Sequence, residues 1–155
     1  MAMDAFSASL MADKREIIFA PTVYKFETFA QMAEEFKLND RDVVLTNEFI
    51  YKPFMEELGL KCQFVFQEKF GAGEPSEAMI QTMYDAIPYD SYDRVIAVGG
   101  GAIMDLCKLL GCKRPDTVHN LYFKRFPVVH EKDVIAIPTT CGTGSECTNI
   151  SVAIV

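Results

Sequence analysis

The sequence is poor in the residues that bind metals and nucleic acids. It has two histidines and five cysteines, and no two cysteines form a C-x-x-C pair. No spacing among these residues is typical of a zinc or iron site. Fifteen Lys and Arg residues stand against 22 Asp and Glu residues, for a formal net charge of −7. Because nucleic-acid binding depends on clustered positive charge, we expect no nucleic-acid partner.

The sequence also lacks a long apolar segment. No run reaches the roughly 20 residues that a helix needs to span a bilayer, so we expect no membrane partner. Residues 1–12 have no basic region and carry Asp4, which argues against a secretory signal. We expect residues 1–16 to be a flexible tail. An odd number of cysteines and no signal favour reduced thiols and a cytoplasmic protein.

What the sequence does have is a regular alternation of apolar patterns. Half of its 155 residues are hydrophobic, which is enough to bury a core. Continuous apolar runs predict strands at 43–46, 62–66, 94–98 and 134–137. Apolar residues at helical spacing predict helices at 27–37, 49–58 and 76–87 and a fourth helix after residue 101. Residues 17–20 and 23–26 read as a hairpin-like pair, and residues 111–133 as a loop that crosses to the last strand.

Strands that alternate with helices and are apolar throughout are typical of sheets that are covered on both faces. We therefore predict an α/β fold, with a Rossmann-like, mainly parallel sheet and helices on both faces. Ligands of such sheets bind beyond the carboxyl ends of the strands.

Three consecutive glycines, residues 99–101, follow one predicted strand and precede a helix. Without a Cβ they let an anionic ligand approach the backbone, and the helix start offers free N–H groups. We expect Asp105 in the first turn of that helix, where it accepts loop amides or a ligand donor. The alternative is a turn that needs glycine only for packing. The segment is not the usual dinucleotide fingerprint, since Met104 stands where a third Gly or Ala is expected.

A second motif follows the last predicted strand. Five hydroxyl side chains surround Gly142 and Gly144, and they offer short donors for a ribose, a pyrophosphate or a carboxamide. A plain Gly/Thr turn is the alternative. Cys141 has no histidine in the motif to activate it. The two histidines, His119 and His130, flank the crossover and are expected to be surface or packing residues.

The two motifs together resemble a known family. Gly-Gly-Gly-Ala-x-x-Asp-x-x-Lys at residues 99–108 and Pro-Thr-Thr-x-Gly-Thr-Gly-Ser-Glu at residues 138–146 are similar to the two signatures of the iron-containing, group III alcohol dehydrogenases. The resemblance spans residues 17–155. It implies that these residues form the dinucleotide-binding domain, and that the helical metal-binding domain is absent. An Asp and three His that hold iron or zinc in relatives would lie beyond Val155, so we expect no metal ligand and no catalytic residue in this chain.

The resemblance also implies a cofactor, NAD. The glycine run would hold the pyrophosphate, the threonines would line the ribose and nicotinamide, and Asn47 would face the adenine ribose. Many relatives have Asp at that position, so a neutral Asn leaves NADP possible. Ala102 stands where the family usually has Ser. The expected cofactor-binding residues are Asn47, Gly99, Gly100, Gly101, Ala102, Asp105, Thr139, Thr140, Thr143 and Thr148.

For the intact enzyme the family implies a small-molecule alcohol or hydroxy acid as substrate and a homo-oligomer. In that enzyme the metal polarises the alcohol oxygen while hydride passes to the nicotinamide. We expect the isolated chain to be inactive. Two alternatives stay open: a truncated, non-catalytic nucleotide-binding or interaction domain, and a relative that acts on another short-chain alcohol or diol.

Overall fold

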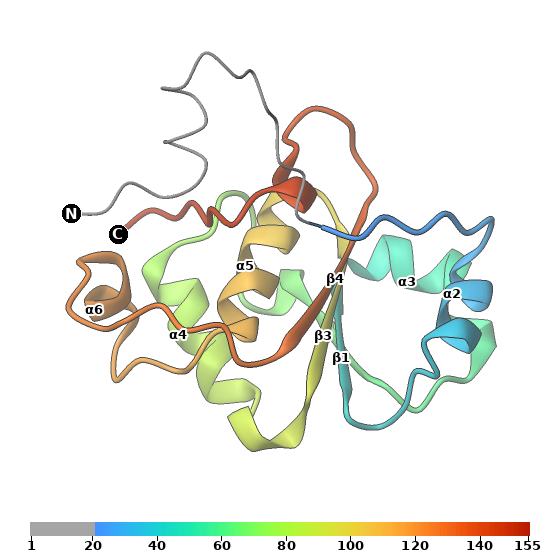
Figure 1. Cartoon of the computed structure of the whole chain (residues 1–155), viewed down its shortest axis with the longest axis horizontal. Helices are drawn as coiled ribbons and strands as arrows, with labels where there is room; N and C mark the ends of the chain where they lie inside the picture. The colour runs from blue at the N-terminus through green and yellow to red at the C-terminus, as the bar shows by residue number, and fades with distance from the viewer. Residues whose placement is uncertain (1–20) are drawn as a thin grey trace, which may run out of the picture.

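The computed structural model describes residues 21–155 (Figure 1). The expected tail at residues 1–16 and the expected strand at residues 17–20 lie outside this range. A four-stranded sheet forms the centre, in the order β2-β1-β3-β4, and all three pairings are parallel. Its strands are β1 (Asp42–Thr46), β2 (Gln63–Phe66), β3 (Arg94–Gly99) and β4 (Asp133–Pro138). The predicted α/β class with a parallel sheet is confirmed.

Helices cover both faces of the sheet. Figure 1 shows α2 (Phe29–Glu35) and α3 (Glu48–Phe54) on one side of the sheet and α4 (Glu77–Ala86), α5 (Gly101–Gly111) and α6 (Val118–Tyr122) on the other. Short 3₁₀ turns complete the chain: η1 (Glu56–Leu58), η2 (Gln67–Lys69), η3 (Tyr89–Ser91) and η4 (Ser145–Cys147).

Alternate residues of the strands build two cores. Val43 and Leu45 of β1 pack in one cluster with α4 and α5, while Val44 packs in the other with Met32 of α2 and Ile50 of α3. All five residues of β1 are buried. A continuous apolar strand is therefore needed here, because each face of the sheet meets a helix layer.

A buried ion pair joins the beginnings of β1 and β3. The Arg94 guanidinium donates from Nε to Asp42 Oδ1 at 2.7 Å and from Nη2 to Asp42 Oδ2 at 2.8 Å. The Asp42 side chain is only 2% exposed. This bidentate pair fixes the two strands next to each other at the end of the sheet opposite the carboxyl ends.

Three expectations about secondary structure are wrong. Residues 23–26 form no strand; instead, Tyr24 and Phe26 pack against the ring of Phe36, with centroids 5.2 and 6.0 Å away.

The other two concern later segments. Residues 111–133 contain α6, which is capped by the Thr117 side chain as it accepts from the Asn120 N–H. Asp105 lies in the second turn of α5, because the helix begins at Gly101. The other predicted strands and helices are present, with η1 as a separate turn that ends at Gly59 in the left-handed conformation.

Candidate functional site

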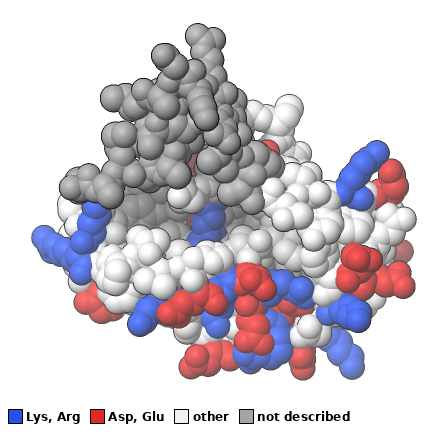
Figure 2. All heavy atoms as spheres, viewed as in Figure 1, with Lys and Arg blue, Asp and Glu red and all other residues white. Residues whose placement is uncertain are grey.

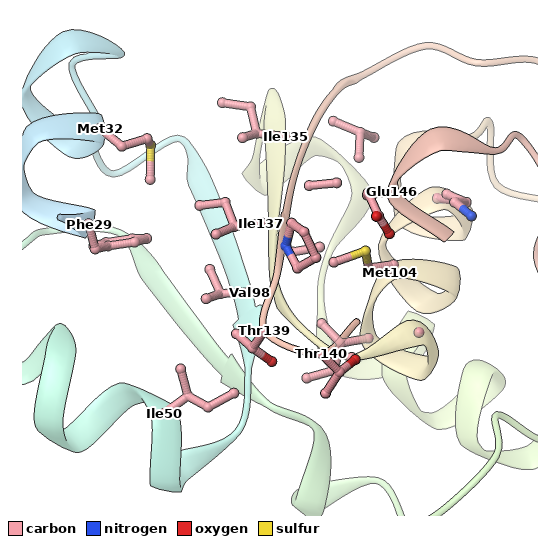
Figure 3. A pocket seen from close by; sticks show the side chains of 18 of the residues that line it. Phe29, Met32, Ile50, Val98, Met104, Ile135, Ile137, Thr139, Thr140 and Glu146 are labelled. Atoms are coloured by element: carbon pink, nitrogen blue, oxygen red, sulfur yellow. The ribbon is translucent and has the colours of Figure 1, made fainter. Parts of the chain in front are cut away.

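A wide cleft opens at the carboxyl ends of β1, β3 and β4. Figure 3 shows its apolar side, with Phe29, Met32 and Ile50 from the α2 and α3 layer facing Ile137 of β4. Its polar side carries Thr139 and Thr140, which directly follow β4. In Figure 2 acidic and basic side chains are interspersed along the lower edge of the molecule, where the strands begin. From the carboxyl ends the cleft extends along β4 as far as Arg94 and Asp133, where β3 and β4 begin.

The three glycines of the turn differ in what a side chain would meet. A Cβ on Gly99 would lie 2.5 Å from Ile103 Cδ1, inside the core. A Cβ on Gly100 would lie 3.4 Å from Thr140 Oγ1, and one on Gly101 would lie 2.9 Å from the Thr143 Cγ2 atom. Gly99 is thus required by packing, whereas Gly100 and Gly101 bring the backbone close to the threonines.

The start of α5 provides hydrogen-bond donors without a partner in the helix. The first hydrogen bond along the helix runs from the Met104 N–H to the Gly100 carbonyl, at 3.2 Å. Amides ahead of Met104 therefore have no acceptor in the helix, and no side chain of the described range caps the helix at Gly100. Gly100, Gly101 and Ala102 line the cleft. This geometry suits a phosphate, which would accept from the free amides at the positive end of the helix dipole.

Residues 139–148, here called the threonine loop, run alongside this helix start. The Thr139 N–H donates to the Gly99 carbonyl at 3.0 Å and so extends the pairing of β3 with β4. Thr143 accepts from the Ser145 N–H at 3.3 Å. Gly144 is left-handed, with φ of 63°. The loop is thereby folded against the glycine turn, and one extended ligand can contact both.

A polar cluster below the threonine loop holds it on α5. Lys108 Nζ lies within hydrogen-bond distance of four acceptors, which share its three N–H donors: Ser145 Oγ at 2.6 Å, the Ile150 carbonyl at 2.7 Å, Asp105 Oδ1 at 3.1 Å and Thr148 Oγ1 at 3.2 Å. The other Asp105 oxygen accepts from the main-chain N–H of residue 152. Asp105 thus accepts a hydrogen bond from a loop amide, which was one of its two expected roles. Both of its carboxylate oxygens have hydrogen-bond partners within the protein.

Asn47 lies at the far end of the cleft, directly after β1. Its side-chain amide donates to Glu68 Oε1 at 3.0 Å. Glu68 follows β2 and is exposed. Sequence reasoning missed Glu68, although one signal was available: Asn47 and Glu68 follow adjacent strands of a parallel sheet, and carboxyl ends of such strands meet at one edge.

Seven of the ten expected cofactor-binding residues line this cleft. They are Asn47, Gly100, Gly101, Ala102, Thr139, Thr140 and Thr148. Gly99 lies beneath the turn, Thr143 contacts the Gly101 position, and Asp105 belongs to the Lys108 cluster. Their role in cofactor binding stays a prediction.

Comparison with known proteins identifies the family. The family model "Iron-containing alcohol dehydrogenase" matches residues 20–155. The chain belongs to the iron-containing alcohol dehydrogenase family. The resemblance that the two motifs carry is confirmed.

Two proteins of known name are similar in sequence to this chain. The chain is 48% identical over 134 residues to a 4-hydroxybutyrate dehydrogenase of Clostridium kluyveri, a match that covers 86% of this chain and 36% of that protein. It is 37% identical over 87 residues to a rat mitochondrial hydroxyacid-oxoacid transhydrogenase, over 51% of this chain and 19% of that protein. The chain thus spans about a third of the length of the first of these relatives and less of the second.

Solved structures of the family share the fold. An iron-containing alcohol dehydrogenase of Thermotoga maritima superposes with a TM-score of 0.59 at 24% identity, over 81% of this chain and 40% of that chain. A sulfoacetaldehyde reductase of Bifidobacterium kashiwanohense, solved in complex with NAD+, gives a TM-score of 0.60 at 19% identity, over 83% and 39%. At these identities the likeness shows the fold, which is the Rossmann-like domain of the family.

The described residues do not fit the metal of the family. Residues 21–155 contain no group of three or more His, Cys, Asp or Glu side chains that could hold a metal ion. His119 stacks on Phe123, with ring centroids 4.2 Å apart, and lies 3.5 Å from Glu77. Within the same range no helix is long and apolar enough to cross a membrane.

Proposed function

We propose that this chain is the NAD-binding part of a metal-dependent alcohol dehydrogenase that oxidises 4-hydroxybutyrate to succinate semialdehyde. The observation that carries the proposal is the 48% identity to the Clostridium kluyveri 4-hydroxybutyrate dehydrogenase over 86% of the chain. The cleft geometry supports it, since the free amides of α5 and the hydroxyls of the threonine loop line one continuous cleft.

In this proposal each part of the cleft binds one part of the cofactor. The amides at the start of α5 donate to the diphosphate, for which Gly100 and Gly101 leave room. Thr139 and Thr140 donate hydroxyl hydrogen bonds on the nicotinamide side, and Asn47 lies on the adenosine side. When bound, NAD supplies the acceptor for the hydride of the alcohol. The chain's own residues bind and orient that acceptor.

The NAD complex of the Bifidobacterium kashiwanohense relative supports the choice of cofactor. Because residues 21–155 contain no metal-binding group, we assign no step of the reaction to a metal held by them. A homo-oligomer and a cytoplasmic location stay predictions of the family resemblance and of the cysteine content.

Binding of NAD to the 155-residue chain tests the cofactor site. Isothermal titration with NAD should give a measurable heat that disappears in Gly100→Val, because the valine side chain would project toward Thr140 and fill the cleft above the free amides. Ala78→Val, at an exposed position of α4 away from the cleft, is the matched control and should bind as the unchanged chain does. Unchanged binding by Gly100→Val would contradict the proposed cradle.

A chimera tests the place of this chain in a 4-hydroxybutyrate dehydrogenase. The matching 134 residues of the Clostridium kluyveri enzyme are replaced by their counterparts here, and NADH formation is followed with 4-hydroxybutyrate and with ethanol. We expect 4-hydroxybutyrate-dependent NADH formation that Gly100→Val abolishes. A folded chimera that binds NAD but forms no NADH would contradict the assignment to this enzyme.

A further inference from the structure

We infer that Glu68 makes this site select NAD over NADP, by holding a carboxylate beside the place of the adenine ribose. The inference rests on the proposed function, since it assigns the adenosine end of the cofactor to the Asn47 end of the cleft. It concerns a residue that the sequence motifs do not include. The two cofactors differ only in a phosphate on the 2′ oxygen of that ribose, so a charge at this point decides between them.

The fold places Glu68 at the end of β1 although it follows β2. The two strands are parallel neighbours, with Thr46 opposite Phe66. The 3₁₀ turn η2 begins directly after β2. Glu68 Oε1 then accepts from Asn47 Nδ2 at 3.0 Å and from the Glu48 N–H at 3.2 Å. Two donors thus hold one carboxylate oxygen at the start of α3.

The Glu68 carboxylate replaces the acidic side chain that position 47 lacks. Asn47 makes no capping bond to its own helix α3; Glu68 accepts the helix N–H in its place. Asn47 therefore donates a hydrogen bond to Glu68, and the negative charge at this point of the fold belongs to Glu68. The carboxylate of Glu68 stands next to the residue that would face the ribose.

The second oxygen of Glu68 is available for a ligand. Both hydrogen bonds fall on Oε1, and among residues 21–155 no group donates to Oε2. A ribose 2′-hydroxyl can donate to such an oxygen, whereas a 2′-phosphate is repelled by it. The carboxylate is exposed, so the repulsion acts through water and is weakened by salt.

Neighbouring charges do not cancel that of Glu68. Lys52, one turn along α3, pairs with Glu48 at 3.1 Å. Lys69 lies over the ring of Phe66, with its Nζ 5.3 Å from the ring centroid. In the part of the chain that the structure describes, Glu68 forms no ion pair. Its charge therefore stays unpaired beside Asn47, which lines the cleft.

The test compares the affinities of the 155-residue chain and its Glu68→Gln variant for NAD and NADP. Titrations at about 0.02 M and about 0.5 M salt give the ratio of the NADP to the NAD dissociation constant under weak and strong screening. We expect Glu68→Gln to lower this ratio about tenfold at low salt, mainly through tighter NADP binding. High salt should lower the ratio for the unchanged chain and hardly affect the variant. Glu57→Gln, which removes one charge from the exposed surface of η1, should leave the ratio unchanged.

The outcomes separate the inference from the proposed function. A chain that binds neither NAD nor NADP contradicts the proposed function and the inference with it. A chain that binds NAD, with a ratio that Glu68→Gln leaves within about twofold of the original, contradicts the inference alone. An equal loss of both cofactors would show that Glu68 acts only as a helix cap, and this too would overturn the inference.

Discussion

Gly101 lies so close to Thr143 that a Cβ added to the glycine would be 2.9 Å from Thr143 Cγ2, closer than two carbon atoms pack in a folded protein. The first residue of α5 is therefore packed closely against the threonine loop. A side chain at position 101 therefore requires the Thr143 side chain to move.

Gly101→Ala should therefore weaken NAD binding at least tenfold without unfolding the chain, because alanine is favourable in a helix while Thr143 beside the helix start has to move. Titration calorimetry and urea denaturation measure the two effects. Gly99→Ala is the contrasting variant: its Cβ would lie 2.5 Å from Ile103 Cδ1, and it should cost about 1–3 kcal/mol of unfolding free energy. Full NAD affinity in Gly101→Ala would show that this close packing has no role in binding.

Ala102→Ser should strengthen NAD binding. Ala102 lines the cleft in the first turn of α5, and a serine hydroxyl there adds one donor for a phosphate oxygen. One such hydrogen bond contributes about 1 kcal/mol, or about fivefold in the dissociation constant. Ala78→Ser on the exposed face of α4 should have no effect on the titration. A decrease in affinity for Ala102→Ser would place the phosphates elsewhere.

Removal of Asp42 should destabilise the fold strongly. Asp42→Ala leaves the guanidinium of Arg94 without its buried partner, and breaking such a pair costs about 3 kcal/mol. Replacing both residues by Asp42→Ala and Arg94→Met should recover part of that loss. The Arg41–Asp93 pair, whose aspartate side chain is 68% exposed, provides the comparison: Asp93→Ala should leave urea denaturation unchanged. Equal effects at the two aspartates would be inconsistent with the buried pair.

Lys108→Met should loosen the threonine loop. The variant loses the Lys108 contacts with Ser145, Thr148 and Ile150, which join α5 to residues 145–150. It also loses the contact with Asp105 within α5 and leaves that carboxylate as a largely buried charge. We expect a lower melting temperature and weaker NAD binding, with faster hydrogen exchange confined to the loop. Adding Asp105→Asn should restore stability more than affinity. Lys113→Met, on an exposed residue, should behave as the unchanged chain.

The five thiols should react in two classes. Cys62, Cys107 and Cys112 are buried, while Cys141 and Cys147 of the threonine loop are exposed. Burial raises the pKa of Cys62 to about 11 and raises the pKa of the other two buried thiols as well. A raised pKa lowers the thiolate fraction at pH 8, so a thiol reagent should modify two cysteines rapidly and three only after denaturation. Rapid modification of a third cysteine in the folded chain would contradict the core described here.

Much of the fold could be predicted because its central strands are apolar on both sides. Residues 43–46 are buried throughout, so the continuous apolar run alone located β1. The strand expected at residues 23–26 failed because Tyr24 and Phe26 use their rings to cover Phe36 instead of pairing their backbone. Helix α6 was missed because it is five residues long and buries only Val118 and Leu121.

Local sequence patterns predicted only part of the candidate site. The glycine turn and the threonines could be found because each motif follows a strand. The contact of Asn47 with Glu68 joins side chains that follow different strands, and three of the four partners of Lys108 lie 37 to 42 residues beyond it. Neither arrangement has a periodicity, so only the three-dimensional fold brings these groups together.

The chain beyond the threonine loop returns to a different helix. The Glu77 N–H donates to the Ile154 carbonyl at 2.9 Å, and the Ile154 N–H donates to the Pro75 carbonyl at 2.8 Å. The loop is thus anchored by β4 at one end and by the start of α4 at the other. A ligand that enters the cleft meets backbone already restricted by folding, so little conformational entropy remains to be lost on association and the site is preorganised.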